Sequence, residues 1–256
     1  MKKPILGIYS LTCCEGCQVE LINLGERLLE LFEIYNLGNF SWVEEKKDPK
    51  QFDVVLVEGS PMTEENFKTL RELRKKSKIL VALGTCAHLG GIQKIKNYTE
   101  NKKGDKVKMI YKDWRKIYDV NIDPISNIVK VDYVIPQCQI NKEEAYKILV
   151  ALATGRKPYI LNRPVCYECQ TNGYECLLQL GEPCLGPITL GGCGAVCLKS
   201  KRFCYGCRGP VKGIDPSKHL ANLKKLVGEK YLKDVMETFG AEDEILGQAK
   251  DYDTNL

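Results

Sequence analysis

The sequence predicts an α/β protein in which a mostly parallel β-sheet, covered by helices on both faces, is followed by an irregular domain at the C-terminus. The first observation is that short apolar runs alternate with amphipathic helical patterns over the first 160 residues. The second is a segment between residues 162 and 210 that holds eight cysteines, many glycines and little helical or strand periodicity. We therefore divide the chain into a sheet domain, residues 1–160, and a cysteine-rich domain with short C-terminal helices, residues 161–256.

Four apolar runs are predicted to form buried strands. They cover residues 4–11, 53–58, 78–83 and 131–135, and a further short strand is predicted at residues 40–43. Helices are predicted at residues 18–35, 64–76 and 142–154, and two short ones at 217–227 and 231–239 precede an acidic, loose end. Thr63 is the expected N-cap of the second helix, because acidic residues follow it in the first turn and basic residues end the helix.

The composition indicates a soluble globular protein of the cytoplasm. Of the 256 residues 44% are hydrophobic and 28% are charged, and the net charge of +5 comes from scattered lysines, which indicates a solvated surface. The thirteen cysteines do not suggest a disulfide framework, because their number is odd and no secretory signal or twin arginine is evident. No apolar run approaches the roughly 18–20 residues of a transmembrane span. In a reducing compartment, clustered cysteines usually hold metals.

Cysteines follow three of the four predicted strands directly. Cys14 and Cys17 come after the first strand, Cys86 after the third and Cys138 after the fourth. Because the carboxyl ends of parallel strands meet at one edge of a sheet, these four thiols are expected to lie together there. The alternative, buried apolar cysteines at strand ends, suits any one loop better than all three together.

The remaining eight cysteines form a second group of candidate ligands. They are Cys166, Cys169, Cys176, Cys184, Cys193, Cys197, Cys204 and Cys207. Two pairs have the C-x-x-C spacing that lets two thiolates point at one metal centre, and eight ligands suit two four-cysteine sites. A segment with so little periodicity buries too little apolar surface to order itself, so metal binding must supply part of its folding free energy.

The cysteine spacing favours iron–sulfur clusters over zinc. Zinc ribbons use paired knuckles about ten to twenty residues apart. Here the cysteine-rich segment has only two C-x-x-C pairs, and its other gaps run from four to nine residues. Three four-cysteine sites would use twelve of the thirteen cysteines and leave Cys13 or Cys14 spare. We favour Cys14 as the ligand, because it completes a C-x-x-C pair. A zinc-organised binding or scaffold module is the alternative, and iron and sulfide analysis would separate the two.

Three motifs resemble the small subunits of NiFe hydrogenases. They are Cys14-Glu15-Gly16-Cys17, then Gly84-Thr85-Cys86-Ala87 with Gly90-Gly91, then Pro136-Gln137-Cys138. In that family these loops hold a proximal 4Fe-4S cluster on a flavodoxin-like domain, and the later cysteines are similar to the ligands of medial and distal clusters. The resemblance covers roughly residues 3 to 210. Without a twin arginine, the chain looks more like the cytoplasmic branch, the deazaflavin-reducing, heterodisulfide-reductase-linked and sulfhydrogenase enzymes.

The resemblance implies three ligand sets. Cys14, Cys17, Cys86 and Cys138 would be proximal, Cys193, Cys197, Cys204 and Cys207 medial, and Cys166, Cys169, Cys176 and Cys184 distal. Many members have a histidine where Cys166 stands. Many have a proline where Cys197 falls, with a 3Fe-4S cluster there. The cysteines at these two places imply three 4Fe-4S clusters.

The implied function is electron transfer rather than catalysis, so no catalytic residue is assigned. In this family the nickel–iron site lies on a separate large subunit, and this chain would pass electrons between that subunit and a further redox subunit with flavin or iron–sulfur centres. A nucleic-acid partner is not expected, because the basic stretch at 94–116, read as a solvated insertion, lacks interleaved aromatic residues. The alternative is the cluster-bearing small subunit of respiratory complex I, which the tandem Cys13-Cys14 and Glu20 also resemble. That subunit lacks the eight-cysteine extension.

Overall fold

A computed structural model describes residues 2–43, 49–98 and 121–253 of the chain. Its centre is a five-stranded sheet in the order β2-β1-β3-β4-β5, and every neighbouring pair is parallel. The strands are β1 Ile5–Ser10, β2 Asn36–Phe40, β3 Phe52–Glu58, β4 Ser77–Leu83 and β5 Tyr133–Ile135. This is the strand order of flavodoxin-like folds, so the predicted fold class is confirmed.

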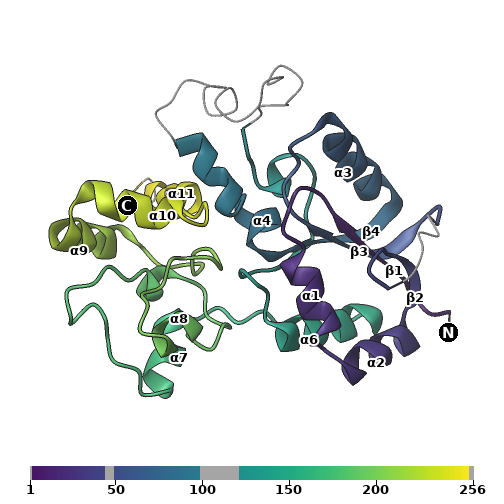
Figure 1. The fold of residues 1–256 in the computed structure, drawn as a ribbon, viewed down its shortest axis with the longest axis horizontal. Helices are drawn as coiled ribbons and strands as arrows, with labels where there is room; N and C mark the ends of the chain where they lie inside the picture. The colour runs from purple at the N-terminus through teal and green to yellow at the C-terminus, as the bar shows by residue number, and fades with distance from the viewer. Residues whose placement is uncertain (1, 44–48, 99–120, 254–256) are drawn as a thin grey trace.

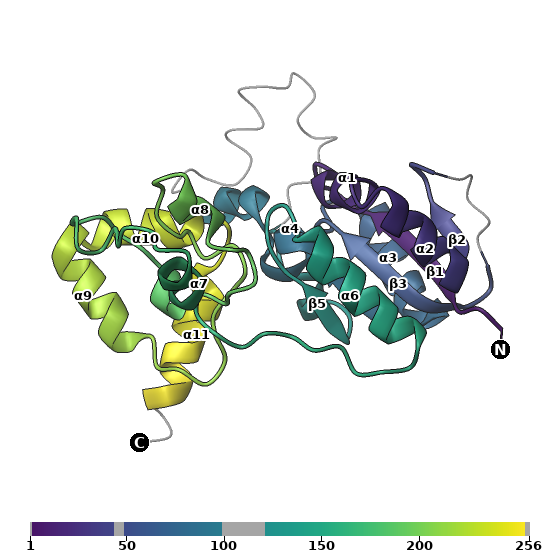
Figure 2. The ribbon, with the colours of Figure 1, turned by 90° about the horizontal axis from the view of Figure 1, so that it is seen from below.

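Helices cover both faces of the sheet (Figures 1 and 2). One face carries α1 Gly16–Ile22, α2 Glu26–Ile34 and α6 Lys142–Ala153, and the other carries α3 Glu64–Lys76, α4 Gly84–Leu89 and the 3-10 turn η3 Ile125–Asn127. In β3, Val54 and Leu56 pack toward the first group of helices, and Val55 and Val57 pack toward the second. Burial on both faces explains why the strands appear as continuous apolar runs.

Two predicted elements near the N-terminus are wrong in detail. The helix expected at 18–35 is broken into α1 and α2, because Gly25 adopts a left-handed φ of 62° between them. The short strand expected at 40–43 lies earlier, at β2, where Leu37 pairs with Leu6 of β1 and Phe40 with Ile8. Asparagine and glycine dominate β2 and are poor strand formers, so this stretch of sequence carries little strand signal.

The predicted N-cap Thr63 is confirmed, and the structure adds a second N-cap, Asn141. The Thr63 hydroxyl accepts a hydrogen bond from the Asn66 backbone N–H at 3.1 Å, an interaction that typically contributes about 1 kcal/mol to helix stability. Helix α6 begins after Asn141, whose side chain accepts hydrogen bonds from the N–H groups of Glu143 and Glu144. Both helices therefore begin and end within a residue of the predicted positions.

The C-terminal part is largely irregular up to residue 216. Its regular elements there are α7 Val165–Thr171, the 3-10 turn η4 Gly186–Ile188 and α8 Val196–Lys199. Helices α9 Ser217–Val227 and α10 Glu229–Glu237 follow, close to the predicted bounds. The side chains of this part form their own apolar cluster, which includes Leu185, Leu198 and Leu223. The boundary near residue 160 stays a prediction.

The tail and the basic stretch differ from the predictions. Residues expected to be loose form helix α11 Glu242–Asp253, which is anchored by the buried Ile245. Within the basic stretch, the 3-10 helix η1 Ile92–Tyr98 contains Lys94, which is buried, and its ammonium pairs with Asp243 at 2.6 Å. Lys94 is therefore not part of a solvated insertion, whereas residues 99–116 lie outside the described part of the chain.

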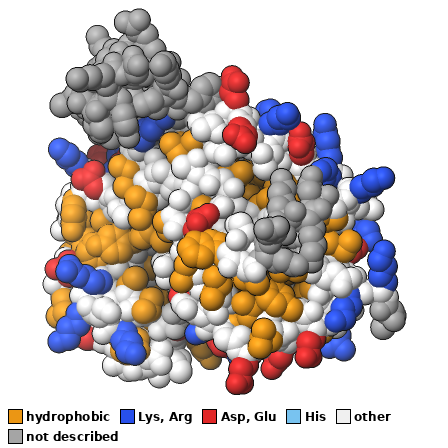
Figure 3. Space-filling model, turned by 45° about the vertical axis from the view of Figure 1, so that its right-hand side comes forward, with side chains coloured by type: hydrophobic (Ala, Val, Ile, Leu, Met, Phe, Trp, Pro, Cys, Tyr) orange, Lys and Arg blue, Asp and Glu red, His pale blue; other side chains and the backbone are white. Residues whose placement is uncertain are grey.

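On the face shown in Figure 3, basic and acidic side chains are interspersed around the rim, and hydrophobic side chains lie between them. None of the helices in the described ranges is both long enough and apolar enough to cross a bilayer.

Candidate iron–sulfur sites

The first candidate site lies where β1, β4 and β5 end. Burial raises the pKa of the Cys86 thiol to about 12, and the neighbouring Cys138 and Cys14 raise this pKa further. The pKa of Cys138 is raised by burial and then by Cys14, and that of Cys17 is raised by burial, by Glu58 and also by Cys138. These mutual effects agree with the predicted convergence of Cys14, Cys17, Cys86 and Cys138 at this edge, and their assignment to one site stays a prediction.

Two glycines make room for the thiols at this edge. A Cβ atom on Gly84 would lie 2.4 Å from the Cys17 Sγ, and one on Gly91 would lie 2.6 Å from the Cys86 Sγ. Both distances are far below van der Waals contact, so neither position accepts a side chain without moving a candidate ligand. The Thr85 backbone N–H donates to the Gln137 carbonyl at 3.2 Å and ties the loop after β4 to the loop that carries Cys138.

A buried carboxylate supports the first site and was missed by sequence reasoning. Glu58 ends β3, is 1% exposed, and accepts hydrogen bonds from the backbone N–H groups of Cys17 at 3.1 Å and Gln18 at 3.3 Å. Burial raises the pKa of Glu58, and the hydrogen bonds from Cys17 and Gln18 oppose that rise. Glu58 thereby fixes the first turn of α1 and the position of Cys17. The only signal in the sequence was a charged residue at the end of an apolar strand.

Cys13 lies near the same edge. Its Sγ is 3.8 Å from the Leu11 carbonyl oxygen, and burial, followed by Glu58, raises its pKa to about 12. Cys86 also raises the pKa of Cys13. Cys14 raises the pKa of both Cys86 and Cys138. Both tandem cysteines therefore lie near other candidate ligands, and the choice of Cys14, which rests on the C-x-x-C spacing, stays a prediction.

The second candidate site contains the four cysteines assigned to the distal cluster. Burial raises the pKa of Cys166 to about 12, and Cys184, Cys169 and Cys176 raise it further. Burial also raises the pKa of Cys184, with smaller contributions from Cys169 and Cys176. Cys166 and Cys169 share one turn of α7. These mutual effects agree with one site for the four cysteines, and that assignment stays a prediction.

The third candidate site contains the four cysteines assigned to the medial cluster. All four line one small cavity, and Cys138 of the first set lines it too. Burial raises the pKa of Cys207 to about 12. The backbone N–H of Cys138 opposes this rise, whereas Cys193 and Cys197 add to it. Burial also raises the pKa of Cys204, the fourth member, and the nearby Cys184 and Cys207 raise it further.

The donor chemistry of the three sets fits iron–sulfur clusters. Each set offers four thiols, and thiolates are the usual ligands of 4Fe-4S clusters. Among the residues that the structure describes, no three histidine, cysteine, aspartate or glutamate side chains are placed to hold one metal ion together. A 4Fe-4S cluster binds each thiolate through a different iron atom, so that finding concerns single-ion sites.

Backbone strain is concentrated in the same loops. In the described ranges, the non-glycine residues with positive φ are Glu15 at 60°, Gln137 at 108°, Ala195 at 51° and Lys201 at 53°. Each lies between, or next to, candidate ligands. Such conformations cost free energy and persist where the surrounding structure requires them, commonly at functional sites.

The two histidines are not among the candidate ligands. His88 packs against Gly209, and burial, with Lys212 and Arg208 nearby, lowers its pKa to about 4, so its ring is neutral at pH 7. His219 of α9 lies with its Nε2 2.9 Å from the Cys184 carbonyl oxygen. It contacts the backbone of a candidate ligand rather than a thiol.

Comparison with known proteins places the chain in a family. The family described as NADH ubiquinone oxidoreductase, 20 Kd subunit, matches residues 14–152, more than half of the chain. The chain belongs to this family. Sulfhydrogenase 2 subunit delta of Pyrococcus furiosus is 37% identical over 236 residues, which cover 91% of this chain and 98% of that protein. A vhu subunit of the F420-non-reducing hydrogenase of Methanocaldococcus jannaschii is 31% identical, and the match covers 89% of this chain and 90% of that protein.

Solved structures agree with these relatives. A chain of an NAD+-reducing NiFe-hydrogenase in the H2-reduced state is 28% identical, with a TM-score of 0.55 over 62% of this chain and 95% of that chain. A chain of the NiFeSe-hydrogenase of Dm. baculatum, 18% identical with a TM-score of 0.56, shares the fold over 83% of this chain and 96% of that one. The predicted resemblance to hydrogenase small subunits is confirmed, and within this family the chain is a relative of hydrogenase subunits.

Proposed function

We propose that the chain is the electron-transfer small subunit of a NiFe hydrogenase. It would relay electrons between the nickel–iron site of a separate large subunit and a further redox subunit through three 4Fe-4S clusters, and would not turn over H2 alone. The observation that supports this proposal is that hydrogen bonds join Thr85, next to Cys86, to Cys207, and join Cys204 to Cys184. The cytoplasmic location stays a prediction.

The first connection joins the proximal and medial sets. The backbone N–H of Cys138 stabilises the thiolate form of Cys207, and the Thr85 hydroxyl, next to Cys86, donates to the Cys207 carbonyl at 2.6 Å. Cys138 also lines the medial cavity. These observations support the proposal that the proximal and medial sites are neighbours.

The second connection joins the medial and distal sets. The backbone N–H of Cys204 donates to the Cys184 Sγ at 3.4 Å in a buried position, and the Leu185 N–H donates to the Cys204 carbonyl at 3.0 Å. These contacts support the proposed order of proximal, medial and distal sites along the relay.

The ligand sets are proposed as predicted. Cys14, Cys17, Cys86 and Cys138 would hold the proximal cluster, Cys193, Cys197, Cys204 and Cys207 the medial one, and Cys166, Cys169, Cys176 and Cys184 the distal one. Each bound cluster would supply one-electron redox chemistry at a potential set by thiolate ligation, burial and hydrogen bonds to sulfur. The protein's own part is to hold the thiolates, to bury them and to donate backbone N–H groups to them.

The coverage of the comparisons favours a hydrogenase over a complex I subunit. The family match ends at residue 152, before the eight-cysteine segment begins. The sulfhydrogenase relative, in contrast, covers 91% of this chain and so extends into that segment. A relative that shares the extension is the better guide to the function of the whole chain.

Purification of the complex tests the proposal. A tag on this chain, used under anaerobic conditions, should recover a nickel-containing large subunit, and H2 should reduce iron–sulfur signals on this chain. A preparation that contains zinc, lacks inorganic sulfide and has no nickel-containing partner would contradict the proposal.

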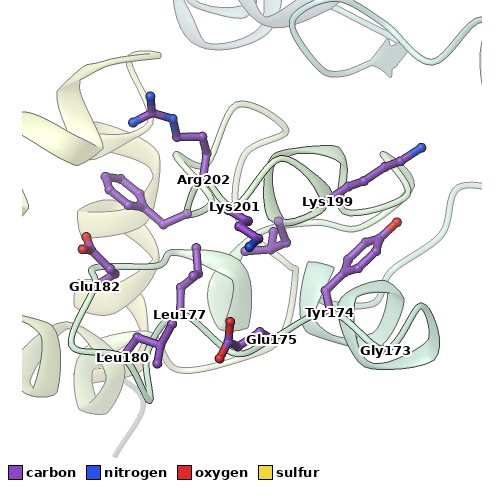
Figure 4. A pocket seen from close by; sticks show the side chains of 11 residues that line it. Gly173, Tyr174, Glu175, Leu177, Leu180, Glu182, Lys199, Lys201 and Arg202 are labelled. Carbon is purple, nitrogen blue, oxygen red and sulfur yellow. The ribbon is translucent and has the colours of Figure 1, made fainter.

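The further redox subunit has a candidate docking surface beside the distal and medial sites. A cavity of about 470 Å³ lies between residues 173–182 and residues 198–203 (Figure 4). Leu177, next to Cys176, contributes to its apolar lining. Lys199 and Arg202 extend outward from its rim, and neither forms an ion pair with a residue in the described ranges. We infer that an acidic segment of the electron-accepting subunit docks on this basic rim, although Glu175 and Glu182, which also line the cavity, limit the positive field.

Charge reversal at this rim is expected to weaken binding of the accepting subunit. The double variant Lys199→Glu, Arg202→Glu should reduce the amount of that subunit recovered with the complex about tenfold at low salt, because like charges oppose docking. The large subunit should be retained, and H2 should still reduce the clusters of this chain. Lys225→Glu, an exposed position on α9, is the matched control. Equal recovery of the accepting subunit from both variants would rule out this surface.

A further inference from the structure

Arg208 is a fully buried cation in the middle of the proposed relay. It follows Cys207 directly, and its side chain is the largest of the fully buried ones in the described residues. Its Nη1 donates to the Pro136 carbonyl at 3.3 Å and to the Gln137 Oε1 at 3.0 Å, so the guanidinium contacts the loop that carries Cys138.

The other side of the guanidinium faces the medial site. A Cβ atom on Gly192 would lie 2.4 Å from the Arg208 Nη2, so the cation touches the backbone that leads into Cys193. Arg208 also lines the cavity that the four medial cysteines share with Cys138. One positive charge therefore lies between the proximal loop and the medial thiols.

Only part of this charge is compensated. Nη2 forms an ion pair with the Glu144 Oε1 at 2.8 Å, but the Arg208 Nε and the Glu144 Oε2 have no hydrogen-bond partner among the described residues. Buried polar atoms are nearly always paired, and a buried ion pair is rarely the most stable choice for a core. A contribution to stability therefore does not by itself explain the Arg208–Glu144 ion pair.

We propose that Arg208 is a positioning residue that holds the proximal loop against the medial loop and raises the reduction potential of the medial cluster. This inference rests on the proposed function. Reduction adds one electron, and therefore one negative charge, to the centre. A fixed cation in a buried, low-dielectric site stabilises the reduced form relative to the oxidised form. The carboxylate of Glu144 offsets the positive charge of Arg208 and therefore lowers the reduction potential.

Redox titration of the purified complex, followed by EPR under anaerobic conditions, tests the proposal. Arg208→Gln should lower the equilibrium constant for one-electron reduction of the medial cluster about tenfold, which is about 59 mV in midpoint potential. Arg208→Lys keeps the charge and should recover most of the shift. Glu144→Gln leaves the cation uncompensated and should shift the potential upward.

Arg208→Gln removes a positive charge and Glu144→Gln removes a negative charge, so a charge effect should shift the midpoint potential in opposite directions. A packing effect has no reason to depend on the sign of the removed charge. Arg156→Gln, at an exposed arginine, is the control and should leave the potential unchanged. If Arg208→Gln does not assemble, Glu144→Gln carries the test alone. An unchanged or lowered medial potential in a Glu144→Gln protein with full iron content would overturn the role of Arg208. A wild-type complex without iron and sulfide would overturn the proposed function itself, and the inference with it.

Discussion

Replacement of Cys86 by serine is expected to lower the iron content of the chain from about twelve atoms to about eight, because each 4Fe-4S cluster holds four irons and needs its four thiolates. Cys86 is well suited to this test because the pKa of its thiol responds to both Cys138 and Cys14, two other members of the proposed proximal set. The medial and distal signals should remain in the EPR spectrum. Iron and acid-labile sulfide analysis of the anaerobically purified complex measures the loss.

The same measurement decides between the tandem cysteines. Cys14→Ser should lose about four irons, and Cys13→Ser, its matched control, should lose none. The reverse result would move the ligand assignment to Cys13, and loss in neither variant would contradict a cluster at this edge. Cys197→Pro extends the series to the medial set with a different expected result. Because the resemblance implies a 3Fe-4S cluster where a proline stands at this place, only one iron should be lost and a 3Fe-4S signal should appear.

The proximal set could be predicted from the sequence because its geometry follows from the topology. Cys14, Cys86 and Cys138 each follow a clear apolar strand, and parallel strands bring their carboxyl ends to one edge whatever the details of packing. For the eight later cysteines, the topology does not predict which of them share a site. Their spacing indicated two four-cysteine sites, but no topological rule divides an irregular loop into sets. That division came from the family resemblance, and the proximity of the thiols in the structure agrees with it.

The supporting residues could not be predicted, because their positions depend on contacts distant in sequence. Glu58 binds backbone N–H groups 40 and 41 residues away, and Arg208 binds groups 64 to 72 residues away. Both are charged residues, for which exposure is the ordinary expectation. Helix α11 was missed for a related reason, since the burial of Ile245 against the C-terminal cluster is a tertiary effect.

Removal of iron is expected to unfold the cysteine-rich segment and to leave the sheet folded. Residues 165–207 contain helices of only seven and four residues and one 3-10 turn, all too short to be stable alone. The core of this part includes Cys184 and Cys204 themselves, so the candidate ligands supply part of the packing. Ligation releases protons from thiols whose pKa is raised by burial, and its free energy becomes folding free energy.

The sheet has a different source of stability. Its two apolar clusters are built from strand and helix side chains such as Leu56, Val57 and Leu70, and Cys17 is the one candidate ligand among their buried members in the described residues. We therefore expect a chelator to raise the amide hydrogen-exchange rates of residues 165–207 by about a hundredfold or more, as for local opening of a segment whose core includes the candidate ligands themselves. The amides of β3 are the internal control and should keep their protection. Loss of protection in both regions together would show that the two parts fold as one unit, and retained protection in residues 165–207 would show that the segment orders itself without metal.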